Sequence, residues 1–254
     1  MRKKFFTIMG VVTVIALFTM TAQVGATPIT FSGSGTNSFT GQAISASATF
    51  DIVGTFLQVT LTNTGADVMA PSDVLTALFF NITGNPLLSR GSATLASGSS
   101  VLFGGSDPGG VVGGEWAYTN TASVGGASQG ISSSGFGIPY AGNFPGSNLQ
   151  GPVSPDGVQY GITSGSDNPA TGNAKVTGGN ALIQNSVVFL LSNLQPNFSL
   201  AQISNVSFQY GTGLNEPNLP GNPVPEPATM LLLGSGLIGM AGYGRKKFRK
   251  QLSA

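Results

Sequence analysis

The chain has 254 residues, of which 7% are charged and 41% are hydrophobic, and it contains no cysteine and no histidine. The apolar content is sufficient for a folded core, whereas the lack of Cys and His excludes disulfides, zinc–thiolate sites, imidazole ligands and Ser-His-Asp chemistry. Eight of the ten basic residues lie at the two ends of the chain, so the acidic middle is not expected to bind nucleic acid.

The N-terminus has the features of a secretory signal peptide. Three basic residues at 2–4 precede an apolar run over 5–20, and small residues follow, with Val24 and Ala26 at the positions that a signal peptidase reads. We expect residues 1–26 to form a signal helix that directs export through the Sec translocon and is removed by signal peptidase after Ala26. An uncleaved membrane anchor is the alternative, although the apolar run is short for a membrane span.

Residues 46–62 show the alternation of a β-hairpin. Apolar side chains occupy every second position up to Ile52, and after Gly54 the apolar set continues at Leu57, Val59 and Leu61. This pattern predicts two adjacent strands joined by a tight turn.

Further short runs, separated by turn sequences, are also typical of strands. None is long enough to indicate a helix. The body, residues 27–223, is therefore predicted to be all-β, as an antiparallel β-sandwich of which a jelly roll is one version. The runs are Val74 to Ile82, Ser100 to Phe103, Glu115 to Thr119, Gly157 to Thr163, Ser186 to Ser192 and Ile203 to Tyr210.

A glycine-rich region extends over about residues 104–151. It is either a long insertion or a segment that carries short edge strands. Its composition predicts a mobile loop.

Carboxylates are the remaining candidates for acid–base chemistry in the body. A glycosidase needs two of them about 5 to 10 Å apart. Folding could pair Asp107 with Glu115, or Asp156 with Asp167. Each lies in a turn-like context, which favours solvated turn residues over catalytic ones. We therefore predict no catalytic residues and no cofactor, and the protein is not expected to be an enzyme.

Two weaker possibilities concern ligand binding. The pairs 156–157 and 167–168 could supply oxygen ligands to calcium, but the EF-hand spacing is absent, so no metal site is predicted. Four aromatic side chains could form a sugar-stacking platform, although packing in the core is the favoured interpretation. They are Trp116, Tyr118, Tyr140 and Tyr160.

The C-terminal region contains an uncharged segment from Ala228 to Tyr243. As a helix it would be about 24 Å long, which is short of a hydrocarbon core of about 30 Å. It is apolar or small on all sides, unlike a core helix with one polar face, so it predicts a transmembrane helix. The basic cluster that follows is expected on the cytoplasmic side. It consists of Arg245, Lys246, Lys247, Arg249 and Lys250.

A proline-flanked carboxylate precedes this helix, in the sequence Val224, Pro225, Glu226, Pro227. Proline is tolerated in the first helical turn, and an acidic residue there suits the helix dipole. The order of tripeptide, short apolar helix and basic terminus resembles the PEP-CTERM sorting signal of bacterial surface proteins. The resemblance implies that an exosortase cleaves at the tripeptide and that the product reaches the cell exterior. Sortase and GPI signals fit less well.

Two stretches of the body are also similar to one group of exosortase-dependent proteins. They are residues 70–82 and 208–213. The first lies on a predicted strand and the second ends one, so we expect a structural role at sheet edges.

Together these features predict an exported protein of a gram-negative-type bacterium. Residues 224–254 would hold the precursor in the inner membrane until an exosortase releases it to the cell surface or to an exopolysaccharide matrix, where the body has a structural or interaction role. The alternatives are a carbohydrate-binding module or weak glycosidase on the same tail, and a permanently anchored periplasmic protein.

Overall fold

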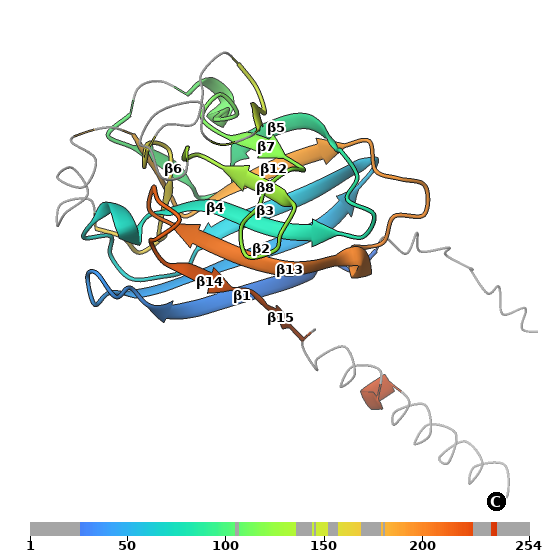
Figure 1. The fold of residues 1–254 in the computed structure, drawn as a ribbon, viewed down its shortest axis with the longest axis horizontal. Coiled ribbons are helices and arrows are strands. Elements are labelled where there is room, and N and C mark those ends of the chain that lie inside the picture. The colour runs from blue at the N-terminus through green and yellow to red at the C-terminus, as the bar shows by residue number, and fades with distance from the viewer. Residues whose placement is uncertain are drawn as a thin grey trace, which may run out of the picture.

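The chain folds into two β-sheets (Figure 1). The computed structural model describes residues 26–104, 107–135, 144, 146–151, 157–168, 179, 181–225 and 235–237. Their regular structure consists of strands, three short 3₁₀ helices and one helical turn at 235–237. The predicted all-β class is confirmed.

The first sheet is antiparallel and is built around the predicted hairpin. In this hairpin β2 (Ala43–Val53) pairs with β3 (Phe56–Asn63), and Gly54 in the turn has a φ of 61°, which glycine adopts without steric cost. The order across the sheet is β15 (Asn222–Val224), β1 (Ile29–Thr36), β2, β3, β12 (Ser186–Ser192) and β5 (Ser89–Leu95).

The second sheet is centred on β4 (Leu75–Ile82), which pairs with β8 (Gln129–Ser132), β10 (Ile162–Thr163) and β13 (Ile203–Tyr210). Strands β10 and β11 (Leu182–Gln184) are parallel, so the prediction of a purely antiparallel fold is wrong at this pair. Residues 164–181 separate these two strands, enough chain for the crossover that parallel strands need. The order is β6 (Ser100–Leu102), β11 (Leu182–Gln184), β10 (Ile162–Thr163), β4, β8 (Gln129–Ser132), β7 (Ala117–Thr119) and β9 (Ser147–Asn148), with β13 (Ile203–Tyr210) beside β4 and β14 (Asn218–Pro220) beside β13.

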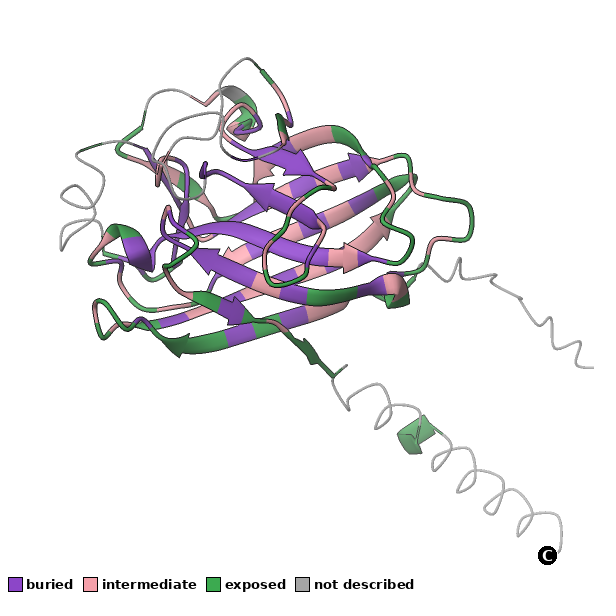
Figure 2. Cartoon of the chain, in the orientation of Figure 1, coloured by how far each residue is buried: buried purple, intermediate pink, exposed green. Residues whose placement is uncertain are grey.

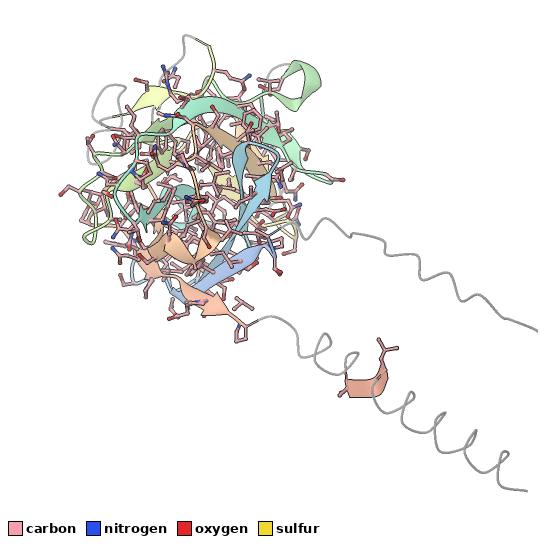
Figure 3. The ribbon with its side chains drawn as sticks, turned by 90° about the vertical axis from the view of Figure 1, so that its right-hand side faces the viewer. Carbon is pink, nitrogen blue, oxygen red and sulfur yellow. The ribbon has the colours of Figure 1, made fainter. Side chains whose placement is uncertain are left out.

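The main hydrophobic core lies between the two sheets, where side chains of both fill the space (Figure 3). Alternate residues of β2 are buried, as expected for a strand with one face on a core. Two edge-on aromatic contacts join the sheets. The ring centroids of Phe50 and Phe80 are 5.3 Å apart, and those of Trp116 and Phe189 are 5.0 Å apart.

The glycine-rich region contributes to the second sheet. It contains β7, β8 and β9, and all residues of β7 and β8 are buried (Figure 2). A second apolar cluster forms here, in which Phe79 and Ala77 of β4 pack with Ala117, Ala127 and Phe144. The prediction of a mobile loop is therefore wrong for the described part of this region, because its apolar residues cover the outer face of β4.

Both predicted terminal helices fall largely outside the described residues. Residues 1–25 of the signal helix lie outside them, and of the predicted transmembrane segment only 235–237 are described. Within the described residues, no helix combines the length and apolar character needed to cross a membrane.

Candidate processing site

The two predicted processing sequences emerge at the same end of one strand pair. Strand β15 runs antiparallel to β1, and Val224, its last residue, is opposite Thr30, the second residue of β1. The chain therefore enters β1 and leaves β15 at neighbouring positions. Ala26 and Pro225 lie just beyond these strand ends, and both are exposed. Ala26 and Pro225, which belong to the two predicted processing sequences, thus lie at one edge of the body.

The segment before β15 is held tightly against β1. A Cβ atom at Gly33 would lie 2.7 Å from the carbonyl oxygen of Pro220, and one at Gly35 would lie 2.8 Å from Leu219. Only glycine allows so close an approach. The backbone N–H of Gly221 then donates to the carbonyl of Val206 at 2.8 Å. This anchor lies where the chain passes from β14 in the second sheet to β15 in the first.

Strand β15 itself is held much more weakly. All three of its residues are exposed, which Figure 2 shows as green along the strand. Pro223 has no N–H to donate, and it is tolerated because β15 is an edge strand. Val224, the first residue of the predicted sorting motif, is 46% exposed. The predicted domain boundary between residues 223 and 224 falls inside this strand.

The other predicted processing residues are not described. Val24, Glu226 and Pro227 lie outside the described residues, as does the basic cluster Arg245, Lys246, Lys247, Arg249 and Lys250.

The two stretches singled out in the body lie side by side. Strand β4 of the first stretch pairs with β13 of the second, and Tyr210 is opposite Leu75. Beyond the strand end, Gly211 N–H donates to the Val74 carbonyl at 2.8 Å, and the Thr76 hydroxyl donates to the Gly211 carbonyl. The expected structural role agrees with this contact. The expected edge position does not, because β4 has strands on both sides.

A buried carboxylate lies near the start of the first stretch, residues 70–82. Asp73 accepts hydrogen bonds from Asn37 Nδ2 at 2.6 Å and Thr40 Oγ1 at 2.7 Å, and from the backbone N–H groups of Met69 and Ala70 at 3.2 and 3.1 Å. These four donors satisfy a side chain that is 2% exposed. The arrangement is that of a structural carboxylate, and the sequence interpretation missed it.

The structure describes both members of only one candidate acid pair, Asp107 and Glu115. The hydroxyl of Tyr160 donates to Asp107 Oδ1 at 3.0 Å. Burial, this hydrogen bond and the charges of Asp107 and Glu115 raise the pKa of Tyr160 to about 12. The charges of Asp107 and Glu115 thus act on the side chain of Tyr160, and neither residue lines the grooves described below. Asp156 is not described, so its pairing with Asp167 stays a prediction.

Asp167 and the aromatic residues occupy structural positions. Asp167 is 3% exposed and accepts the N–H of Val68 at 3.1 Å. Among the described residues, no group of three or more Asp or Glu side chains is placed to hold a metal ion. Trp116 and Tyr160 are buried, which confirms core packing for these two, whereas Tyr118 is buried but also lines the polar groove described below, and Tyr140 is not described.

A polar groove of about 780 Å³ opens elsewhere, between β5, the end of β7 and β9. None of its lining residues is acidic. Arg90, the sole basic residue in the part of the chain that the structure describes, lines it and donates to the carbonyl of Asn148. Leu87, 64% exposed, adds an apolar surface. The amide and hydroxyl side chains around them include Asn120, Thr121, Asn148, Gln150 and Asn193. The sequence interpretation did not identify this groove.

A hollow of about 390 Å³ lies where the second stretch ends, and its lining includes Phe39, Ser72 and Glu216. The carboxylate of Glu216 accepts the backbone N–H groups of Thr212 and Gly213 and so closes this loop.

Comparison with protein families gives one match, to the PEP-CTERM protein-sorting motif, over residues 223–247. It confirms the resemblance seen in the tripeptide, apolar segment and basic cluster. No curated protein and no solved structure matches the chain.

Proposed function

From the PEP-CTERM sorting motif that this chain carries, we propose an exported surface protein whose β-sandwich body has a structural or interaction role at the cell surface or in an exopolysaccharide matrix. The motif itself marks the chain for export, for an exosortase and for sorting to the cell surface. The matrix role and the jelly-roll form of the body are part of our proposal, because the matched motif concerns sorting alone. The sandwich assignment is supported by the aromatic contacts between the two sheets.

The proposed route has four steps. The Sec translocon exports the chain, and signal peptidase removes residues 1–26. The apolar segment after Pro227 then holds the precursor in the inner membrane, with the basic cluster in the cytoplasm. Finally, the exosortase cuts near the tripeptide Pro225–Glu226–Pro227 and releases the body.

We propose that the body acts by binding and not by catalysis. Support comes from the positions of the carboxylates. Asp73 and Asp167 are engaged by backbone donors, and Asp107 holds the Tyr160 hydroxyl. Incubating the purified surface form with polysaccharides and measuring reducing ends tests this, and sugar release would contradict it.

An immunoblot with one tag after Thr27 and another after Lys250 tests the route. We expect the first tag in the surface fraction without the second. If both tags stay together there, the permanently anchored alternative replaces this proposal. Glu226→Ala should leave export intact and cause uncut precursor to accumulate in the membrane, because it removes the charge of the tripeptide. Asp51→Ala, outside the motif and on the partly exposed face of β2, is the matched control and should be cut.

The polar groove favours a second candidate, a carbohydrate-binding module. Amides, hydroxyls and one apolar side chain suit a sugar, and the guanidinium of Arg90, with no acidic residue in the lining, suits a sugar carboxylate. Affinity electrophoresis in polyuronate gels tests this. Arg90→Ala should raise the Kd about tenfold or more, as expected for loss of a charge-assisted contact. Arg90→Lys should retain part of the affinity, and no retardation of the unmodified protein would exclude this candidate.

A further inference from the structure

Val224 belongs to two structures at once. It lies within the PEP-CTERM sorting motif, and it is the last residue of β15, where it is paired with Thr30 of β1. The PEP tripeptide begins at the next residue, so no spacer separates the sequence to be cut from the sheet.

These two roles compete at the moment of cutting. A protease holds its substrate as an extended segment through the backbone groups of that segment. While β15 is paired, the backbone groups on the side of β1 are not available to a protease groove. With β15 paired, Pro225, the first residue of the tripeptide, is also held near the start of β1. Release of residues 222–225 would extend the tether by up to about 13 Å, at about 3.3 Å for each residue.

The contacts show where such a release would stop. Leu219 is 9% exposed, and the glycines of β1 hold the chain at Pro220. Gly221 is bonded to Val206. All residues after it in β15 are exposed, at the edge of the sheet and next to a single strand. The fold thus has a firm anchor at Leu219–Gly221, followed at once by a short strand that can separate.

We propose that the exosortase takes β15 off β1 and receives residues 222–224 as an extended segment together with the PEP tripeptide. The inference rests on the proposed exosortase processing and adds that β15 is part of the substrate. The body supplies the fixed point at Gly221, and cutting requires the β1–β15 pair to open.

A reversible cross-link tests the opening. The chain has no cysteine, so the variant Thr30→Cys with Val224→Cys introduces one defined pair at partnered positions, which can form a disulfide in an oxidising periplasm. With the disulfide closed, we expect cutting to fall about tenfold or more, because a misplaced substrate loses at least that much rate, and reductant should restore it.

The matched control is Ser47→Cys with Thr62→Cys, a partnered pair of β2 and β3. It carries the same number of cysteines but leaves β15 free to separate from β1, so it should be cut at near the rate of the unmodified chain in both redox states. Normal cutting of the closed Thr30–Val224 pair, with the disulfide verified by mass spectrometry, would overturn the inference alone. An uncut unmodified chain would refute the proposed function itself, and this inference with it.

Hydrogen exchange gives a second measurement that needs no substitution in the chain. When a catalytically inactive exosortase binds the unmodified precursor, those amides of residues 30–32 that point to β15 should exchange about tenfold faster or more, because their edge partner has left, whereas those that point to β2 should not change. Unchanged exchange in the bound complex would also overturn the proposal. This readout decides the matter if a cysteine at position 224 by itself prevents cutting.

Discussion

Strand β15 carries the start of the matched sorting motif, and β4 lies in a stretch whose resemblance to exosortase-dependent proteins stays a prediction, and the surroundings of the two strands are opposite. Strand β4 lies inside the second sheet, and all but one of its residues are buried. Strand β15 is at the edge of the first sheet, and all its residues are exposed. The comparison separates two reasons for a distinctive sequence. Strand β4 builds the core, whereas β15 is placed where another protein can reach it.

The largest effect is expected from a core truncation in β4. Phe80 is fully buried and contacts Phe50 across the sheets. Phe80→Ala should lower the free energy of unfolding of the mature body by about 3–5 kcal/mol, because a cavity replaces the ring. Chemical denaturation followed by Trp116 fluorescence measures it. A loss under about 1 kcal/mol would show that β4 is not the centre of the core, and Phe80→Leu should lose less.

The next effect concerns the carboxylate that precedes β4. Asp73→Ala removes the acceptor of Asn37, Thr40 and two backbone N–H groups. Leaving buried donors unpaired should cost about 2–4 kcal/mol in the same denaturation experiment. Asp51 is a matched carboxylate on the partly exposed face of β2, and Asp51→Ala should change stability by less than about 1 kcal/mol. Equal losses would mean that Asp73 has no special role.

A third prediction concerns the close approach of β14 to β1. Gly33→Ala places a Cβ 2.7 Å from the Pro220 carbonyl oxygen, so the backbone must shift. We expect a loss of about 1–3 kcal/mol, as for other overpacked sites. Ser34→Ala, at the next and exposed position, should stay within about 0.5 kcal/mol. If Gly33→Ala is tolerated as well as Ser34→Ala, then the anchor before β15 is looser than the contacts indicate.

The hairpin β2–β3 could be predicted because its signals are local. The alternation on both sides of Gly54 indicates one buried face. Each of the six further runs predicted as strands contains a strand. Strand β1 was missed because Gly33 and Gly35 indicate a loop in sequence. Their missing side chains are instead what allows Pro220 and Leu219 to approach, a contact between opposite ends of the body.

The remaining failures have the same origin in long-range packing. Gly130 of β8 lies against Phe79. A Cβ atom at Gly130 would lie 3.1 Å from the Phe79 ring, so glycine there indicates close packing and not mobility. Asp73 has a turn-like sequence context, and its partner Asn37 is far away in the chain. The polar groove is assembled from residues 87–90, 118–121, 146–151 and 193, which lie on strands and loops far apart in the chain and carry no motif. The sorting motif could be recognised because it is a continuous segment.

A smaller and gradual effect is expected at alkaline pH. The pKa of Tyr160 is raised from 10.0 to about 12 in the folded protein. The unfolded chain therefore ionises first, and the contribution of Tyr160 is fully present below pH 10 and is lost between about pH 10 and 12. Tyr160→Phe should show a shallower loss of stability over this range in denaturation series. An equal slope in both proteins would show that Asp107 and burial do not hold this phenol neutral.

The smallest effect on stability is expected at β15, where the contrast with β4 is sharpest. Val224 is 46% exposed and pairs only with the edge of β1, so Val224→Ala removes few buried contacts. The free energy of unfolding of the tail-bearing protein in detergent should change by less than about 0.5 kcal/mol, as for other surface substitutions. Val59→Ala on buried β3 is the matched control, since it deletes the same atoms from a fully buried side chain and should cost about 2 kcal/mol or more. If the two valines cost the same, β15 is an integral strand of the body. If Val224→Ala is neutral, β15 contributes little to the stability of the body, as we expect of a strand that separates from β1 before cutting.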